Sequence, residues 1–349
     1  MAINERPGVY SAYEVSSAVS GRGGGGVVGI AAVASQGTEG TGYVINSYAE
    51  AAAAFGPDSS MARLIKILFL NGASSVRAVP VSVGSEPSTA QYEAAFGTLM
   101  DYVQVKVMVC DSHEPSVHEA MKNAIETASE HSKYRIGVVE GAGAVQELVA
   151  AAGDLNCERM VLCAPAEGPA DTALPGAVAA ALAGLIASGS DPALPLNGAA
   201  LYGLSGLSSG FADADINALV QGGITPVENV GGRISVIRGI TTRTATAGAP
   251  DSTWRELTTI LIIDDVIPTI KNSLQSRFSR AKNTAQTRGA IRTQVIIELE
   301  NKLAREIIDS YDNVTVKASE TDPTTCEVSF DFTVAHGLNH IRLTAHITV

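Results

Sequence analysis

The stretch Val105-Lys106-Val107-Met108-Val109-Cys110 decides the fold, because it is one of three short apolar runs separated by helical patterns. The other two runs are residues 134–139 and 160–164, and the amphipathic residues 116–132 and 144–155 lie between them. Short runs that are apolar on both faces are typical of strands in a parallel sheet covered by helices on both sides. The sequence therefore predicts an α/β domain in this part of the chain.

The same alternation continues on both sides of this stretch. Further strands are predicted at residues 27–34 and 75–83, and further helices at residues 47–55, 59–71, 92–99 and 175–188. We place an α/β core domain at residues 23–238. The glycine run Gly21-Arg22-Gly23-Gly24-Gly25-Gly26 precedes a strand, whereas a phosphate cradle follows one and opens a helix. We interpret this run as a flexible hinge behind an N-terminal arm, residues 1–22.

Polar residues follow two of the predicted strands, where ligand sites of parallel sheets lie. Asp111 and His113 suggest an acid/base pair, but polar residues at strand ends are usually turn formers, and no GxSxG elbow accompanies them. Gly141-Ala142-Gly143 is half of a dinucleotide motif whose third glycine is replaced by Gln146. His118 and His131 lack the spacing of zinc ligands. The sequence therefore predicts no catalytic residue, no cofactor and no metal.

Residues 239–337 form a predicted α+β domain. A long helical pattern begins near Thr253, and we expect Pro268 to kink or break it near residue 267. Asp264 and Asp265 at this point are interpreted as a solvated pair rather than a metal site. A second amphipathic helix is predicted at residues 293–311, followed by strands at residues 313–317 and 325–335.

The final residues, His340-Ile341-Arg342-Leu343-Thr344-Ala345-His346-Ile347-Thr348-Val349, alternate polar and apolar side chains. This period of two predicts a half-buried strand, and we assign residues 338–349 to a C-terminal arm. A strand of this kind needs a sheet to join, either in its own chain or in a neighbour.

The net charge of −12 makes general nucleic-acid binding improbable. One basic stripe interrupts the acidic background, with no carboxylate between residues 266 and 297; it consists of Lys271, Arg277, Arg280, Lys282, Arg288 and Arg292. A solvated helix face, a contact between copies and a grip on an acidic partner are all open interpretations. The four cysteines lack CxxC spacing, which favours free thiols in a reducing compartment. No apolar run is long enough to span a membrane and no signal peptide is evident, so we expect synthesis in the cytoplasm.

Several short motifs, taken in order, resemble one known family. They are Arg6-Pro7-Gly8-Val9-Tyr10, Ile240-Thr241-Thr242-Arg243-Thr244, Trp254-Arg255-Glu256-Leu257 and Ile262-Ile263-Asp264-Asp265-Val266. This series is similar to the contractile tail sheath proteins of myophages and phage-tail-like bacteriocins, in their compact form. None of the motifs is catalytic.

The resemblance implies a core domain of subtilisin-like topology without a protease triad, and a small domain that faces a tail tube. It implies stacked hexameric rings that contract, with a tail tube protein, baseplate and tail terminator proteins as partners, and no membrane insertion by this chain. Terminal arms would complete a sheet in neighbouring subunits; the linking residues would be Pro7, Val9, Tyr10, Val15, Ile341, Leu343, Ile347 and Val349. The candidate tube-facing residues are Lys271, Arg277, Arg280 and Lys282.

Two other classes of function remain open. A non-contractile, self-assembling shell or layer protein would share the low charge content and the strand exchange. An α/β enzyme with an unrecognised site is the second alternative, although the polar residues at the strand ends do not form a convergent set.

Overall fold

The computed structural model describes residues 25–84, 86–169, 173–339 and 342–345. The predicted N-terminal arm lies outside these residues. Of the eight predicted linking residues, only Leu343 is described. The predicted linking residues outside the described part are Pro7, Val9, Tyr10, Val15, Ile341, Ile347 and Val349. Leu343 belongs to no strand and is 91% exposed.

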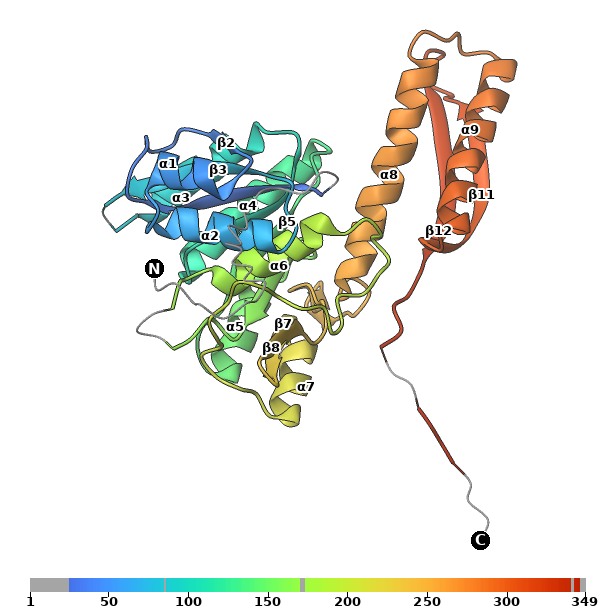
Figure 1. Cartoon of the computed structure of the whole chain (residues 1–349). Helices are drawn as coiled ribbons and strands as arrows, with labels where there is room; N and C mark the ends of the chain where they lie inside the picture. Colours follow the sequence, from blue (N-terminus) through green and yellow to red (C-terminus); the bar gives the residue numbers. More distant parts are fainter. Residues whose placement is uncertain (1–24, 85, 170–172, 340–341, 346–349) are drawn as a thin grey trace, which may run out of the picture.

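A sheet of eight strands forms the centre of the molecule (Figure 1). Its order is β2-β3-β1-β4-β5-β6-β7-β8. The six inner strands, from β3 through β1 to β7, run parallel to one another, and the two edge strands, β2 and β8, run antiparallel to their neighbours. The strands are β1 (Val27–Ala34), β2 (Tyr43–Ile45), β3 (Ser75–Val83), β4 (Val105–Cys110), β5 (Ile136–Glu140), β6 (Met160–Ala164), β7 (Ile224–Val230) and β8 (Arg233–Val236). The predicted α/β class with a mostly parallel sheet is confirmed.

Helices cover both faces of this sheet, as the continuously apolar strands require. One apolar core joins the sheet to α1 (Tyr48–Phe55), α2 (Ser60–Leu70) and α6 (Ala177–Ser188). A second core lies on the other face, against α3 (Thr89–Met100), α4 (Pro115–Glu130), α5 (Val145–Leu155) and α7 (Asp213–Gln221). We call residues 25–242, which contain the sheet and these helices, the sheet body.

Helix α6 is buried nearly all round, which its Ala-rich sequence permits. A Cβ added at Gly184 would lie 2.7 Å from the carbonyl oxygen of Leu68, so the backbones of α6 and α2 touch there. The amide of Gly26 donates to the carbonyl of Ala187 at 2.6 Å, which ties the start of the sheet body to the end of α6. These close approaches join segments that are far apart in the sequence.

Several helices begin at hydroxyl caps that the sequence encodes. The Ser59 side chain accepts from the amide of Ala62 at 3.1 Å and donates to the carbonyl of Gly56 at 2.8 Å at the start of α2. Thr284 caps the start of a later helix, where its hydroxyl accepts from the amide of Thr287 at 3.2 Å. Each cap satisfies an amide that has no partner within its helix.

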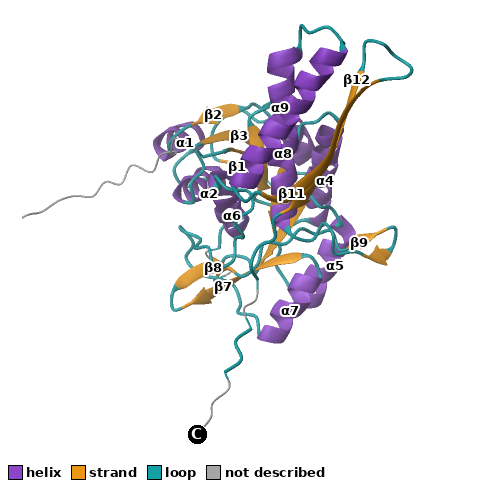
Figure 2. Cartoon of the chain, turned by 90° about the vertical axis from the view of Figure 1, so that its right-hand side faces the viewer, coloured by secondary structure: helices purple, strands orange, loops and turns teal. Residues whose placement is uncertain are grey.

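Two helices and a two-stranded sheet follow and project from the sheet body (Figures 1 and 2). They are α8 (Leu257–Phe278), α9 (Ala285–Ala304), β11 (Ile308–Ala318) and β12 (Cys326–Val334), preceded by the short pair β9 (Ala245–Thr246) and β10 (Ala249–Pro250). We call residues 257–334 the hairpin module. Its apolar side chains form a third core that includes Val266, Ile270 and Leu299.

The structure corrects two predictions in the hairpin module. Helix α8 continues through Pro268, because Val266 and Ile270 on either side are both buried in the third core, so the predicted break is wrong. The helix predicted at residues 293–311 begins earlier, at Ala285, and ends at Ala304. Glu306 then has a positive φ of 57°, which stops the helix, and β11 occupies the remainder.

Candidate assembly surface

The carboxylates at the carboxyl ends of the parallel strands hold the sheet body together. Asp111 accepts the amide of Val33 at 2.8 Å and the hydroxyl of Tyr92 at 2.6 Å, and burial raises its pKa. Glu140 is buried and accepts the amides of Gly176 and Val178, at 3.1 and 2.6 Å, at the start of α6. The crevice where ligands of such sheets bind is therefore filled by the chain itself.

The histidines near these strand ends are also engaged. The Nε2 atom of His113 lies 2.8 Å from Glu140, and that of His118 lies 2.8 Å from the carbonyl oxygen of Ser112. Burial lowers the pKa of His118 to about 4, so it is neutral at physiological pH. In the part of the chain that the structure describes, no three His, Cys, Asp or Glu side chains could hold a metal ion, and no helix is long and apolar enough to cross a membrane.

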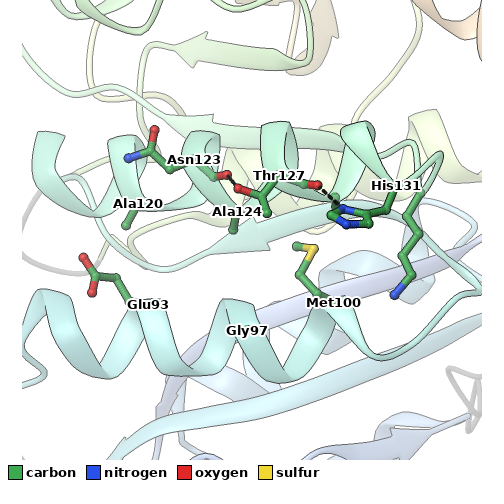
Figure 3. A pocket seen from close by; sticks show the side chains of 10 residues that line it. Glu93, Gly97, Met100, Ala120, Asn123, Ala124, Thr127 and His131 are labelled. Atoms are coloured by element: carbon green, nitrogen blue, oxygen red, sulfur yellow. Dashed lines mark hydrogen bonds between the residues drawn. The ribbon is translucent and has the colours of Figure 1, made fainter.

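A groove of about 440 Å³ lies between α3 and α4 (Figure 3). Its middle is formed by small residues, among them Gly97 and Ala124, with Met100 beside them. Its polar residues stand apart: Glu93 lies on α3, and the His131 ring bonds to the carbonyl of Thr127 at 3.0 Å. This arrangement provides neither a nucleophile with a base nor a convergent set of polar groups, so the groove does not indicate catalysis.

One ion pair fixes the hairpin module to the sheet body, and a second joins α8 to α9 within the module. The guanidinium of Arg159 makes two bonds to Asp264, at 2.7 and 2.8 Å, and lies 4.8 Å from the ring centre of Tyr134. Lys302 pairs with Asp265 at 2.5 Å. The interpretation of Asp264 and Asp265 as a solvated pair is therefore wrong: each has its own cation, and burial raises the pKa of Asp264 although Arg159 opposes this.

The motif at residues 240–244 is fixed to the residues just before β6. The Thr242 hydroxyl donates to the carbonyl of Cys157 and accepts its amide, both at 3.0 Å, and is fully buried. Arg243 pairs with Glu158 at 2.9 Å. No local pattern in the sequence indicates these contacts, since they join residues about 85 positions apart.

The two-stranded sheet of the hairpin module has two unlike edges. β11 contains an extra residue between Ile308 and Ser310 and another between Asp312 and Thr315, so it is bulged twice. At the second bulge the carbonyl of Val314 accepts from Nε of Arg292 at 2.8 Å. β12 has no extra residue, and among the described residues no strand pairs with its outer edge.

The side chains of β12 alternate along all nine residues between half-buried and exposed. The half-buried row, which we call the inner row, is Cys326, Val328, Phe330, Phe332 and Val334. The exposed outer row is Glu327, Ser329, Asp331 and Thr333. A strand that keeps an apolar row only half covered beside an unpaired edge is a site for strand addition.

The side chains of the basic stripe fall into two groups, those that are hydrogen-bonded within the described residues and those that are not. Arg277 bonds to Gln294, Arg288 to Asn283 at 2.9 Å, and Arg292 to Val314. Lys271, Arg280 and Lys282 are exposed, and their side chains make no hydrogen bond or ion pair within the described residues. No cation of the stripe pairs with a carboxylate in that part of the chain, so the charge is available to another molecule.

The chain that leaves β12 turns toward the sheet body. Gly337 lies against Pro195, where an added Cβ would be 2.6 Å from the proline ring. Asn197 donates to the side chain of Asn339 at 2.7 Å. In Figure 1 residues 342–345 lie apart from the hairpin module. Residues 342–345 therefore do not lie beside β12 of their own chain.

Comparisons with known proteins agree on one family. Residues 86–242 match the phage tail sheath protein central domain, and residues 249–348 match the phage tail sheath C-terminal domain. A comparison with curated protein sequences gave no match.

Solved structures share the fold at low sequence identity. A chain of the anti-feeding prophage baseplate, 6-fold symmetrised, superposes with a TM-score of 0.76 at 15% identity, covering 99% of this chain and 100% of that one. A chain of the anti-feeding prophage helical sheath in contracted state gives 0.72 at 15% identity, with 99% of each chain covered. The sheath tail protein from Desulfitobacterium hafniense gives 0.70 at 12% identity, covering 94% and 100%.

Proposed function

Because the chain belongs to the phage tail sheath family, we propose that it is the structural subunit of a contractile sheath that surrounds a tail tube. Subunits would form stacked hexameric rings, and their shortening would drive the tube through a target envelope. The solved relatives with this fold include a helical sheath in its contracted state and a baseplate, which supports contraction and a baseplate partner. The subunit would be made in the bacterial cytoplasm and act without enzymatic activity or a cofactor.

One observation carries this proposal: among the described residues no strand of the same chain pairs with the outer edge of β12, while Leu343 of the terminal segment is almost fully exposed. A strand donated by a neighbouring copy would satisfy both features at once, through main-chain hydrogen bonds and burial of alternate side chains. The arms at residues 1–22 and 338–349 would then link the subunits. The glycine run would let a link persist while the sheet body moves.

Electron microscopy tests the assembly directly. The protein expressed alone and together with its tail tube protein should form tubes or stacked rings, and tubes of two different lengths would support contraction. Deleting residues 341–349 should leave the sheet body folded, with a near-native circular dichroism spectrum, but abolish tubes. A full-length chain that stays monomeric in every condition would contradict the proposal, and tubes that form without any tube protein and never shorten would favour a shell or layer protein.

We propose further that the free cations of the basic stripe face the tube. Within the described part of the chain, the side chains of Lys271, Arg280 and Lys282 have no partner, and that of Arg277 bonds to the neutral Gln294 and to no carboxylate. Replacing Lys271, Arg277 and Arg280 by Glu should weaken assembly on the tube more than self-assembly, because charge reversal repels an acidic tube surface. A matched control replaces the exposed cations Arg63 and Lys66 of the sheet body by Glu. Equal loss in both kinds of assembly would instead place the stripe between subunits.

A further inference from the structure

We propose that the groove between α3 and α4 of one copy receives the tip of the β7–β8 hairpin, residues 228–233, of a second copy. This contact joins two sheet bodies directly and is separate from any link made by the arms. It goes beyond the proposed function, because it requires only that copies of the chain meet.

The tip of the β7–β8 hairpin is narrow. β7 ends at Val230, β8 begins at Arg233, and Gly231 and Gly232 between them have positive φ angles of 61° and 83°. Two such residues form the short turn that suits the twist of a hairpin. A Cβ added at either glycine would meet no described atom within 4 Å, so the turn is free to approach another molecule. Figure 2 shows the hairpin at the lower left margin of the sheet body.

One face of the tip carries an apolar side chain between opposite charges. Val230 pairs with Arg233, and Glu228 precedes Val230 by two residues, so these three side chains share one face of the hairpin. Val230 is 63% exposed, and Glu228 and Arg233 are exposed beside it. Asn229 and the buried Ile234 pair on the opposite face. An apolar centre with a charged rim is the arrangement of a protein interface.

The groove offers a complementary apolar surface. Its volume of about 440 Å³ lies within the range of pockets that hold a ligand, about 300–1,000 Å³. A Cβ added at Gly97 would meet no described atom within 4 Å, so the middle of the groove is open. Met100 and Ala124 line it beside Gly97. An apolar side chain such as that of Val230 would contact apolar partners there.

The two ends of the groove carry opposite charges. Figure 3 shows Glu93 at one end and His131 at the other, and Lys133, two residues after His131, also lines the groove. The side chains of Glu93 and Lys133 make no hydrogen bond or ion pair within the described part of the chain. With the apolar side chain of the tip in the middle, Arg233 faces Glu93 and Glu228 faces Lys133.

The lengths of the two surfaces agree. Glu228 lies two residues, about 7 Å, from Val230 along the strand. Glu93 lies seven residues, about 10 Å, from Met100 along α3. The charged side chains of the tip can therefore reach both ends of the groove at once. The reverse orientation would set Glu228 against Glu93, and repulsion between like charges would oppose it.

The tip that enters the groove belongs to a second copy. α3 packs against β3 and β1, and α4 packs against β5, whereas β7 and β8 form the far end of the sheet. On the same face of the sheet, α5 and α7 cover β6 and β7 and so lie between the groove and the hairpin. The groove and the tip are different surfaces of one chain, so the contact is head-to-tail and builds a ring or a helix.

Disulfide trapping between two variants tests the contact. One variant carries Val230→Cys, and the other carries Ala124→Cys with a tag that changes its mass. Both contain Cys326→Ser, which removes the native cysteine that is not buried. Mild oxidation of the mixed full-length proteins, in tubes and separately in concentrated solution, should give the mixed dimer. Its yield should be at least about tenfold above that of a mixture in which Val44→Cys replaces Val230→Cys. Val44 is a matched control, because it is also an exposed valine on an edge strand of the sheet.

Filling the groove supplies an independent measurement. Gly97→Phe places a ring in the open middle of the groove and should lower the yield of the mixed dimer about tenfold. Gly153→Phe on α5 is the matched control, since it is also an exposed helical glycine whose added Cβ would meet no described atom within 4 Å. Both changes introduce a better helix former, so the free chain stays folded. Equal loss in the two variants, or loss in neither, would contradict the proposal.

A charge exchange tests the orientation of the tip. Glu93→Arg in the Ala124→Cys variant, or Arg233→Glu in the Val230→Cys variant, should lower the yield of the mixed dimer about fivefold. Mixing the two reversed variants should restore the yield to within about twofold of the original. A yield that stays low in this mixture would overturn the pairing of Arg233 with Glu93.

Failure of this inference is distinguishable from failure of the proposed function. Tubes that form without the Val230–Ala124 product would overturn the contact and leave the sheath proposal intact. The product in concentrated solution, with no tubes in any condition, would support the contact and contradict the sheath proposal.

Discussion

The sheet body and the hairpin module differ in whether the outer edge of their last strand is hydrogen-bonded. The outer edge of β8 is covered by its own chain, since Leu201 donates to Ile234 at 2.9 Å and Val236 donates to Ala199 at 3.0 Å. The outer edge of β12 is paired with no strand in the described part of the chain. The difference teaches that the chain itself protects this edge of the sheet body, whereas the hairpin module leaves an edge open to pairing with another strand.

The two regions also differ in how completely their apolar side chains are buried. Phe96 in the sheet body is fully buried, as are most apolar residues of its two cores. Phe330 and Phe332 of the hairpin module stack at 6.2 Å but remain half-exposed. Burial in the isolated subunit therefore stabilises mainly the sheet body, and the hairpin module leaves part of its apolar area exposed.

The largest expected effect comes from truncating one phenylalanine in the core of each region. Phe96→Ala should lower the free energy of unfolding by about 3–5 kcal/mol, because it leaves a cavity in a closed core. Phe332→Ala should lower it by only about 1–2 kcal/mol, because the ring is already partly exposed to water. Urea unfolding of the unassembled subunit measures both. Equal losses would show that the hairpin module is as tightly packed as the sheet body.

The next effect tests the connection between the two regions. Arg159→Met should lower the free energy of unfolding by about 3 kcal/mol at pH 7, because it leaves the Asp264 carboxylate poorly solvated and unpaired. The fluorescence of Trp254, the single tryptophan, reports on this junction during unfolding. The double variant Arg159→Met with Asp264→Leu should recover most of the loss, since no buried charge remains.

The pH dependence of the same variant has a defined sign. Burial raises the pKa of Asp264 in the folded state, and removal of Arg159 takes away the group that opposes this rise. A carboxyl whose folded pKa lies above its unfolded value binds its proton more readily when folded, so the variant gains stability as the pH falls from 7 toward 4. A deficit that stays constant over this range would show that Asp264 reaches water.

The smallest effects compare one helix cap from each region. Ser59→Ala should cost about 1 kcal/mol, since the buried hydroxyl both accepts from Ala62 and donates to Gly56. Thr284→Ala should cost about 0.5 kcal/mol, because water replaces its exposed contact. Thermal unfolding of the two variants under one condition gives the ranking, and a larger loss for Thr284→Ala would contradict it.

Much of the sheet body could be predicted from the sequence because its strands are locally distinctive. β3, β4 and β6 have the predicted bounds, since each is a mostly apolar run between polar turns. β7 and β8 were missed: Pro226 interrupts the first, and Gly231-Gly232 between them resembles an ordinary loop. The order of the strands depends on contacts between distant residues, which no local pattern contains.

The hairpin module was harder to predict because helix and strand patterns overlap there. Leu303 and Ile307 continue the helical spacing of α9, yet Ile307 is buried after the helix has ended, and Ile308 begins a strand. The partners of Asp264 and Asp265 lie 105 and 37 residues away, so the sequence offered no signal for their pairing. The basic residues were found from composition alone, but only the structure separates the free Lys271 from the engaged Arg292. Their orientation toward a tube stays a prediction.

The contact between α2 and α6 at Gly184 also bears on the time course of folding. It joins residues more than a hundred positions apart, and a chain must close a long loop before such a contact forms, which slows the search for the native state. The neighbours in the hairpin module, α8 with α9 and β11 with β12, are adjacent in the sequence and can meet within a short loop. The region with the open edge is therefore expected to fold sooner, once synthesised, than the region that is closed. If the hairpin module folded first, its open edge could pair with another chain before the sheet body had folded. Because the hairpin module is synthesised after the sheet body, this risk is reduced.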